Sequence, residues 1–227
     1  MELKKIKKLV IVGAGETAEI AYEYFMYDSE YEVVAFSVES QYLEKEKLFD
    51  LPVVPFEDVE NYYPPNFHEV FVAVSYTQLN RVRTRLYHLV KQKGFKVASY
   101  ISSKAFIWRN VEIGENCFIF ENNVIQYQVK IGNNVVIWSG NHIGHHSVVG
   151  DNCFISSHVV ISGFCEIGEN SFLGVNATLA NNLKIGKDNW IGPNTAIMKS
   201  TGDGDLYRTP QPEAAQISAP RFFKVDK

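Results

Sequence analysis

An aliphatic residue recurs at every sixth position from residue 101 to residue 197, and this repeat restricts the possible folds more than any other feature of the sequence. The positions follow one another without a break in register: Ile101, Ile107, Ile113, Ile119, Ile125, Ile131, Ile137, Ile143, Val149, Ile155, Ile161, Ile167, Leu173, Leu179, Ile185, Ile191 and Ile197. An α-helix repeats every 3.6 residues and a half-buried strand every 2, so neither produces a period of six. A repeat of short strands does.

A second period, of eighteen residues, indicates that three hexapeptides make one coil. It is marked by a glycine directly after the aliphatic residue, at Gly114, Gly132, Gly150, Gly168 and Gly186. We expect these glycines at tight corners, because glycine tolerates positive φ, with the Asn or Asp two residues later in the same turns. The position four after each aliphatic residue is small or compact almost throughout, as in Cys117 and Val135. The pattern predicts a narrow three-sided prism of stacked coils.

Charge and hydropathy exclude several classes of partner. The 227 residues carry a net charge of −4 and no basic run, so nucleic acid is not an expected partner. No apolar run approaches the roughly 18 residues of a membrane span. The basic N-terminus precedes only the short apolar stretch Leu9–Val12, with no cleavage site. We therefore expect a cytoplasmic protein.

All three cysteines fall on the inward-facing position of the repeat: Cys117, Cys153 and Cys165. We expect small core residues there, not metal ligands or a disulfide.

The first 98 residues alternate between predicted strands and helices. A buried strand over residues 8–12 leads into Gly13-Ala14-Gly15-Glu16-Thr17-Ala18 and then a helix over residues 18–29. Such a turn presents backbone N–H groups and a helix N-terminus to a phosphate. The alternative for this GxGxxA pattern is a tight turn without a ligand. Further strands are expected at 31–38, 51–54, 69–75 and 96–100, and helices at 56–63 and 77–93.

The chain therefore divides into three parts. Residues 1–98 form a Rossmann-like domain with a small parallel sheet, residues 99–198 form the prism, and residues 199–227 form a tail rich in Gly and Pro that covers the open end of the prism. The first domain is too short for a two-half dinucleotide fold, so a mononucleotide-sized ligand suits it better than NAD.

This order of domains, with the opening Ile11-Val12-Gly13-Ala14-Gly15, resembles the nucleotide-sugar N-acetyltransferases related to bacillosamine, perosamine and viosamine acetyltransferases. The resemblance covers nearly all of residues 5–198. It implies that the prism is a left-handed parallel β-helix, an exception to the general right-handed rule. It also implies a homotrimer that binds acetyl-CoA in the groove between neighbouring prisms, in lipopolysaccharide, capsule or glycan synthesis.

The resemblance further implies that the first domain holds the nucleotide of the sugar donor. The positions carried over are Gly13, Gly15, Glu16, Glu39, Ser75 and Tyr76. Glu39, at the end of the second strand, is the expected ribose ligand. The family often has Gly, Asp and Asn at the end of the third strand, where this chain has Ser75-Tyr76-Thr77.

Four of the six histidines lie close together in the repeat, at His142, His145, His146 and His158. The candidate catalytic residues are His145 and His146. The resemblance implies that His145 is the general base that takes a proton from the sugar amine, as an imidazole can at neutral pH. The family usually has an acid at the position of His146, so Asn141 or Glu121 becomes the candidate group that orients His145. The plain alternative is that these histidines are merely polar surface residues.

A metal site is a further alternative, because γ-class carbonic anhydrases share this β-helix and bind zinc through three histidines. Their spacing requires one histidine far upstream of a close pair. No histidine lies between residues 88 and 142 here, so we expect no metal.

Acetyl-CoA needs little side-chain chemistry, because backbone groups usually hold its pantetheine arm. Small outward or corner residues are the candidates for that contact: Gly144, Ser162, Gly163, Gly174 and Ala180. The same residues would also permit close packing between neighbouring prisms.

The sequence thus predicts an N-acetyltransferase that moves an acetyl group from acetyl-CoA directly to the amine of a nucleotide-linked amino-deoxy sugar. Two alternatives stay open. One is a sugar O-acetyltransferase of the sialic-acid type, and the other is a non-catalytic β-helix protein that binds a nucleotide sugar.

Overall fold

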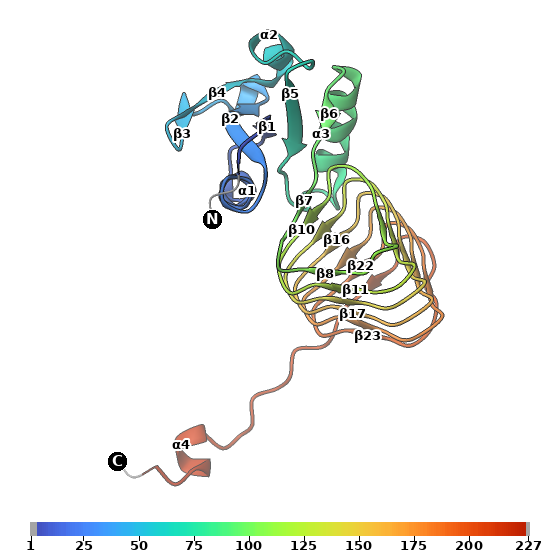
Figure 1. Cartoon of the computed structure of the whole chain (residues 1–227). Helices are drawn as coiled ribbons and strands as arrows, with labels where there is room; N and C mark the ends of the chain where they lie inside the picture. The colour runs from blue at the N-terminus through green and yellow to red at the C-terminus, as the bar shows by residue number, and fades with distance from the viewer. Residues whose placement is uncertain (1–3, 226–227) are drawn as a thin grey trace.

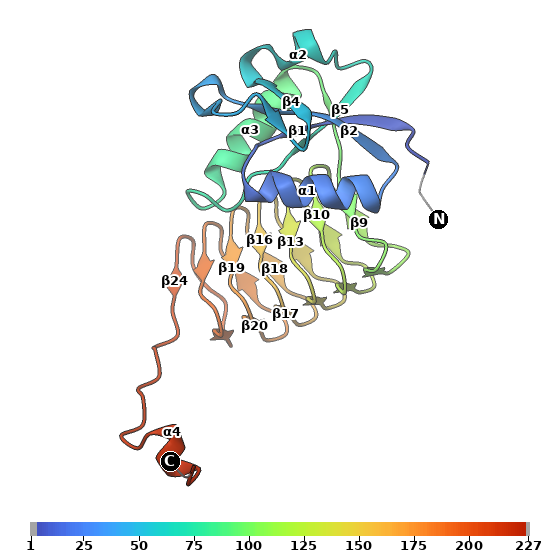
Figure 2. The same ribbon diagram turned by 90° about the vertical axis from the view of Figure 1, so that its left-hand side faces the viewer.

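A computed structural model describes residues 4–225 and shows an α/β domain seated on a three-sided prism (Figure 1). An extended tail leaves the far end of the prism and finishes in the short helix α4 (Ala219–Phe222), away from both domains (Figures 1 and 2).

The first domain is built on a six-stranded sheet with the strand order β3-β4-β2-β1-β5-β6. Its strands are β1 (Lys7–Val12), β2 (Tyr31–Val38), β3 (Lys47–Leu48), β4 (Leu51–Pro55), β5 (His68–Val72) and β6 (Lys96–Val97). All neighbours pair in parallel except β3 and β4, which form a short antiparallel pair at the edge. The parallel sheet expected from the sequence is therefore present, with this one exception.

Helices cover both faces of this sheet. They are α1 (Glu16–Tyr27), α2 (Val59–Tyr62) and α3 (Arg81–Gln92), with short 3₁₀ turns η1 (Ser40–Tyr42) and η2 (Phe56–Asp58). Alternate residues of β1 serve the two faces, since Leu9 and Ile11 pack with α1 whereas Val10 and Val12 pack with α3. The strand period of two thus produces two apolar layers.

The helix predicted over residues 77–93 begins only at Arg81. Gln78, Leu79 and Asn80 all have positive φ, of 52°, 48° and 68°, which a right-handed helix does not permit. The strand predicted over residues 69–75 likewise ends early, at Val72. Residues 73–80 instead form a connection that runs beside the prism.

The prism consists of three parallel sheets whose strands are two residues long. Face 1 contains β7 (Tyr100–Ile101), β10 (Phe118–Ile119), β13 (Val136–Ile137), β16 (Phe154–Ile155), β19 (Phe172–Leu173), β22 (Trp190–Ile191) and β24 (Leu206–Tyr207). Face 2 contains β8 (Phe106–Ile107), β11 (Val124–Ile125), β14 (His142–Ile143), β17 (Val160–Ile161), β20 (Thr178–Leu179) and β23 (Ala196–Ile197). Face 3 contains β9 (Glu112–Ile113), β12 (Lys130–Ile131), β15 (Val148–Val149), β18 (Glu166–Ile167) and β21 (Lys184–Ile185).

Up to β23 each strand pairs with the strand eighteen residues further on, as Ile119 does with Ile137, whereas β22 and β24 pair Trp190 with Leu206. The three stacked sheets confirm the predicted left-handed parallel β-helix. From Ile119 to Ile197 the repeated aliphatic side chains are at most 5 % exposed, so the period of six is the period of the core. Ile101, in the first coil, is 39 % exposed.

The corner glycines have a different role from the one expected. The left-handed conformation belongs to the residue two positions later, such as Asn116 (φ 53°) and Asn134 (φ 57°), and not to Gly114 or Gly132. A Cβ on Gly150 would lie 2.8 Å from the backbone nitrogen of Glu169 in the next coil. The prediction of positive φ at these glycines was therefore wrong, and close stacking of the coils is what requires them.

Face 1 continues past residue 198, where the hexapeptide pattern ends. Strand β24 pairs in parallel with β22, so the start of the tail adds one more strand to the prism. No helix within residues 4–225 has the length and apolar character to cross a membrane.

Substitution of Gly150 by Ala tests this stacking. The new methyl group would meet the backbone of the next coil at Glu169 and Ile167, both at 2.8 Å, so we expect a loss of about 2 kcal/mol of unfolding free energy from overpacking. Gly202→Ala is the matched control, because its Cβ would find nothing closer than 3.4 Å. Chemical denaturation of both variants measures the difference, and equal stabilities would contradict this account of the corner glycines.

Candidate functional site

A cleft of about 390 Å³ opens at the carboxyl ends of β1, β2 and β5. Ligands of open α/β sheets bind at this end of the strands. Five of the six residues predicted to contact a nucleotide line the cleft: Gly13, Gly15, Glu16, Glu39 and Ser75. The strand, turn and helix predicted at the start of the chain therefore bring these five candidate residues together in one cavity.

The glycine turn has a specific geometric cause. Gly13 adopts φ +130°, and a Cβ there would lie 2.6 Å from the carbonyl oxygen of Ala73. Its N–H donates to the carbonyl of Ser37 at 2.8 Å, which closes the turn against β2. Helix α1 then begins at Glu16 with Gly15 as its N-cap. Since the first N–H groups of a helix lack intrahelical partners, this wall of the cleft suits an anion.

Glu39 lies in the cleft but is paired with Arg85 of α3. The two guanidinium nitrogens of Arg85 donate to the two carboxylate oxygens of Glu39, each at 2.8 Å. A carboxylate has further lone pairs, so Glu39 retains the capacity to accept a hydroxyl. Sequence reasoning missed Arg85, because nothing in a helical pattern indicates which arginine reaches the end of a distant strand.

Tyr76 does not lie in the cleft, and its assignment there was wrong. Its ring packs on the aromatic side chains of face 1, 5.0 Å from Phe154 and 4.8 Å from Phe172 between ring centroids. The backbone leaves β5 after Val72 and turns toward the prism, so Ser75 faces the cleft whereas Tyr76 contacts the second domain.

The two candidate catalytic histidines occupy the corner between faces 2 and 3, which we call edge 2–3. Both are exposed, and their Nδ1 atoms lie 3.1 Å apart. The His146 ring stacks on Phe164 with 4.7 Å between centroids. His146, with φ 59°, occupies the left-handed corner position, and its ring centroid lies 5.3 Å from that of His145. The two Nδ1 atoms can share one hydrogen bond, in which either ring is the donor according to its tautomer.

The two groups proposed to orient His145 lie elsewhere. Glu121 belongs to the corner between faces 1 and 2, which we call edge 1–2, and accepts hydrogen bonds from Tyr24 at 2.9 Å and Ser139 at 2.7 Å. Asn141 is buried within the prism and accepts a hydrogen bond from the backbone N–H of Val159 at 2.6 Å. Both assignments were wrong. Glu121 and Asn141 do not belong to the corner that carries His145, and residues at different corners of a coil lie on different edges of the prism.

Four of the five small residues proposed to contact acetyl-CoA lie on edge 2–3 with His145. These are Gly144, Ser162, Gly163 and Ala180, at the corners that follow β14, β17 and β20. Gly174 follows β19 of face 1 and therefore lies on edge 1–2, so it does not join this group. A Cβ on Gly163 would stand 2.8 Å from Cε1 of His145, and glycine at this position leaves room for the imidazole.

An open groove of about 500 Å³ adjoins the histidine pair. It is lined by Phe106, Trp108, Val124, Gln126, Tyr127, His145 and His146. The backbone N–H of His145 donates to Oε1 of Gln126 at 3.0 Å. The groove thus combines an imidazole with exposed apolar side chains.

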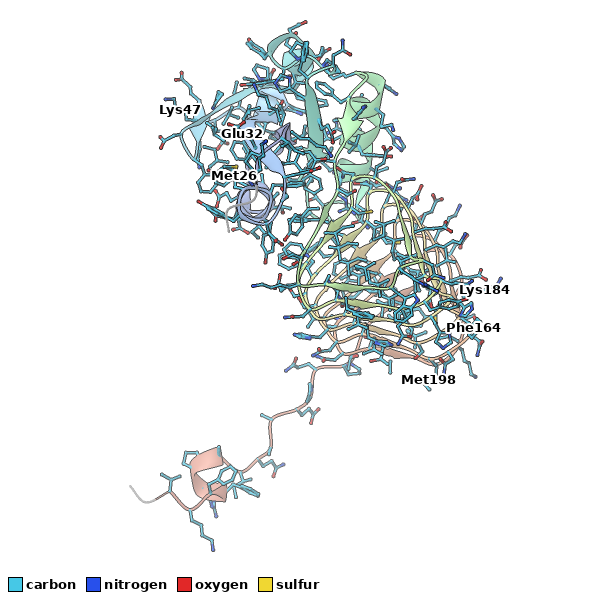
Figure 3. All side chains as sticks on the ribbon, viewed as in Figure 1. Met26, Glu32, Lys47, Phe164, Lys184 and Met198 are labelled. Carbon is cyan, nitrogen blue, oxygen red and sulfur yellow. The ribbon has the colours of Figure 1, made fainter. Side chains whose placement is uncertain are left out.

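The cleft and the histidine pair lie on different sides of one chain. The first domain packs on face 1, where Tyr24 and Phe25 of α1 contact Phe118. Phe164, the neighbour of the histidines on edge 2–3, lies on the side of the prism away from that domain (Figure 3). A single chain therefore presents the two sites separately.

Within residues 4–225, no group of three His, Cys, Asp or Glu side chains is arranged to hold a metal ion. The three cysteines are free and buried. Burial raises the pKa of the Cys117 and Cys153 thiols to about 12, so they remain protonated at neutral pH and are poor nucleophiles.

A thiol titration tests this burial. The native protein is expected not to react with a thiol-specific disulfide reagent at pH 8, because reaction needs an accessible thiolate. After denaturation all three cysteines should react. Rapid labelling of any native cysteine would contradict the core assignment.

Comparisons with known proteins agree with this architecture. The family model for bacterial transferase hexapeptide (six repeats) matches residues 110–145 and 146–181. A search of curated proteins with this sequence found no significant match.

Among solved structures, a point mutant of perosamine N-acetyltransferase from Caulobacter crescentus in complex with CoA and GDP-perosamine aligns with a TM-score of 0.79 at 22% identity, over 88% of this chain and 93% of that one. The acetyltransferase domain of PglB from Neisseria gonorrhoeae FA1090 aligns with a TM-score of 0.76 at 21% identity, over 88% and 96%. WeeI from Acinetobacter baumannii AYE gives the same four values. The predicted resemblance to hexapeptide-repeat transferases is confirmed in the repeat and in the fold.

Proposed function

We propose that the protein is an acetyl-CoA-dependent N-acetyltransferase that acts on the amine of a nucleotide-linked amino-deoxy sugar, in lipopolysaccharide, capsule or glycan synthesis. The observation that carries this proposal is the exposed His145–His146 pair on an edge of the β-helix, in a chain whose other domain has a glycine-turn cleft. The fold of both domains matches a perosamine N-acetyltransferase solved with CoA and GDP-perosamine, and the PglB domain has also been solved with acetyl coenzyme A.

The histidine geometry supports one proton path for this mechanism. His145 has its Nδ1 within hydrogen-bond distance of His146, so Nε2 is the ring nitrogen left to accept a proton. His145 then carries its own proton on Nδ1 and donates it to Nδ1 of His146. In this tautomer the Nδ1 of His146 is the acceptor, and the hydrogen bond holds the ring of His145 in place.

The reaction needs no covalent enzyme intermediate and no metal. The neutral amine attacks the thioester carbonyl, and the new C–N bond forms as the C–S bond breaks. His145 Nε2 takes the proton that the nitrogen loses, and the departing CoA thiolate is protonated in turn. Binding of the nucleotide in the first domain places the amine and so lowers the entropic barrier.

The active form in this proposal is a homotrimer, in which the cleft of one chain meets the histidine pair of a neighbour. Two observations support it. The two sites of one chain lie on different sides, and large apolar side chains stand exposed around face 2, among them Phe106 (52 %), Trp108 (43 %) and Val160 (39 %). Such a surface is typical of an interface between subunits.

Replacement of His145 by Ala tests the general base. We expect kcat to fall by about 10²-fold or more, because positioned general bases contribute 10²–10⁴. The assay is release of the free thiol from acetyl-CoA, with a panel of UDP-, dTDP- and GDP-linked 3- and 4-amino sugars as acceptors. His158→Ala is the matched control, since His158 also occupies a left-handed corner (φ 58°) but follows β16 of face 1.

The panel also separates the alternatives. Full activity in His145→Ala would exclude this residue as the base. Acetyl-CoA binding without turnover of any amino sugar would favour an alcohol acceptor and O-acetylation. Absence of CoA binding would leave the non-catalytic nucleotide-sugar protein.

Mixed oligomers test the shared site. His145→Ala chains keep the cleft, and Gly13→Val chains keep the histidines but lose the turn, which has no space for a side chain beside Ala73. After the two inactive proteins are unfolded and refolded together, about one quarter of the wild-type activity should return if each site joins two chains of a closed ring. No recovery, from particles whose mass by light scattering is three times 25.8 kDa, would place each site within one chain.

A further inference from the structure

Arg83 of α3 is fully buried, yet among the described residues 4–225 no carboxylate accepts a hydrogen bond from it. Burial lowers the pKa of its guanidinium to about 10, so it stays charged at neutral pH. A buried charge is costly unless its donors are satisfied, and arginine has five N–H groups in a fixed plane. The acceptors that satisfy this group are therefore informative.

All of the acceptors of Arg83 lie at the junction of the two domains. On one side, Nη1 donates to the carbonyls of Val74 at 3.4 Å and Ser75 at 2.9 Å. On the other side, Nη2 donates to the carbonyls of Asn152 at 2.9 Å and Cys153 at 3.2 Å, in a coil of the prism. One planar group thus joins the end of the cleft wall to the β-helix.

On the prism side of this contact, asparagine side chains form a ladder of hydrogen bonds. Nε of Arg83 donates to Oδ1 of Asn134 at 3.2 Å. That oxygen also accepts from Asn116 at 2.7 Å, while Asn134 donates to Asn152 at 2.8 Å. The ladder reaches the first domain again, because the backbone N–H of Val72 donates to Asn116 at 2.8 Å. These asparagines occupy left-handed corners in successive coils, so the stacking of the coils fixes their spacing.

The cleft side consists of groups that would surround a bound nucleotide. Ser75 lines the cleft, and so do Val82 and Leu86 of α3, the helix that carries Arg83. From the same helix Arg85 holds Glu39. A displacement of α3 or of residues 73–76 would therefore move one wall of the cleft relative to the prism.

We propose that Arg83 is a positioning residue for the nucleotide sugar, which locks the Ala73–Ser75 wall of the cleft to the β-helix and so sets where the bound sugar stands. This inference rests on the proposed function. Arg83 does not touch the ligand and acts through Ser75 and through the placement of α3.

The test compares Arg83→Met with Arg81→Met. Arg81 also joins α3 to the prism, through Asp188 at 2.5 Å, but this pair is exposed and contributes little to the domain contact. In Arg83→Met we expect the KM for the nucleotide sugar to rise about tenfold, with the KM for acetyl-CoA unchanged. Amide hydrogen exchange at residues 73–76 should accelerate by a similar factor. Arg81→Met should match the wild type in all three measurements.

A purely structural role gives a different result. If Arg83→Met lowers the melting temperature while exchange at residues 73–76 and the KM for the nucleotide sugar stay at wild-type values, the proposal is overturned. An equal rise in both KM values also overturns it.

A second variant and a measurement that needs no enzyme activity keep the proposal testable. Should Arg83→Met not fold, Arg83→Lys retains the charge but has only three donors on a flexible stem, and it should show the same selective effects at smaller size. If the wild-type enzyme acetylates no acceptor, the proposed function fails on its own. Amide exchange at residues 73–76 then decides whether Arg83 locks the wall. Faster exchange in Arg83→Met than in the wild type would support this role, and unchanged exchange would contradict it.

Discussion

Parallel backbone pairing between coils eighteen residues apart is the constraint on which the rest of the structure depends. Each coil donates to the carbonyls of the next on all three faces, as Phe118 does to Val135 and Val136 to Cys153. Because the coils are stacked so closely, every corner residue has a fixed neighbour in the next coil. The asparagine ladder, the room for the His145 ring above Gly163 and the spacing of the groove residues all follow from this one repeat.

The first domain uses the same repeat as its platform. Outward aromatic residues of face 1, including Phe118, Phe154 and Phe172, form an apolar surface that α1 and Tyr76 cover. The buried Arg83 adds a polar contact at the side of that surface. Apolar contacts alone would let the first domain slide along face 1. The planar guanidinium of Arg83 meets its carbonyl and amide acceptors in only one position of the two domains. The domain that carries the cleft is thus fixed in both distance and register.

The two candidate regions share one property, because their polar side chains already have partners within the protein. His146 occupies a left-handed corner, and its Nδ1 lies 3.1 Å from that of His145. In the cleft, an acidic side chain is paired with Arg85 before any ligand arrives. In both places a hydrogen bond or ion pair within the protein restricts the orientation of the candidate side chain.

The sequence by itself determined the prism and its register. A period of six residues is compatible with one way of stacking the coils, and each position of the hexapeptide points either into the core or outward. It also located the glycine turn, since that turn depends on local backbone geometry. Only the tertiary structure decided that Tyr76 faces the prism, that Gly174 and Glu121 belong to edge 1–2, and that Arg83 and Arg85 reach the cleft wall and Glu39. Most of these contacts join segments far apart in the sequence, such as Arg85 with Glu39 and Arg83 with Asn152, and no local pattern encodes which distant surface a long side chain will meet.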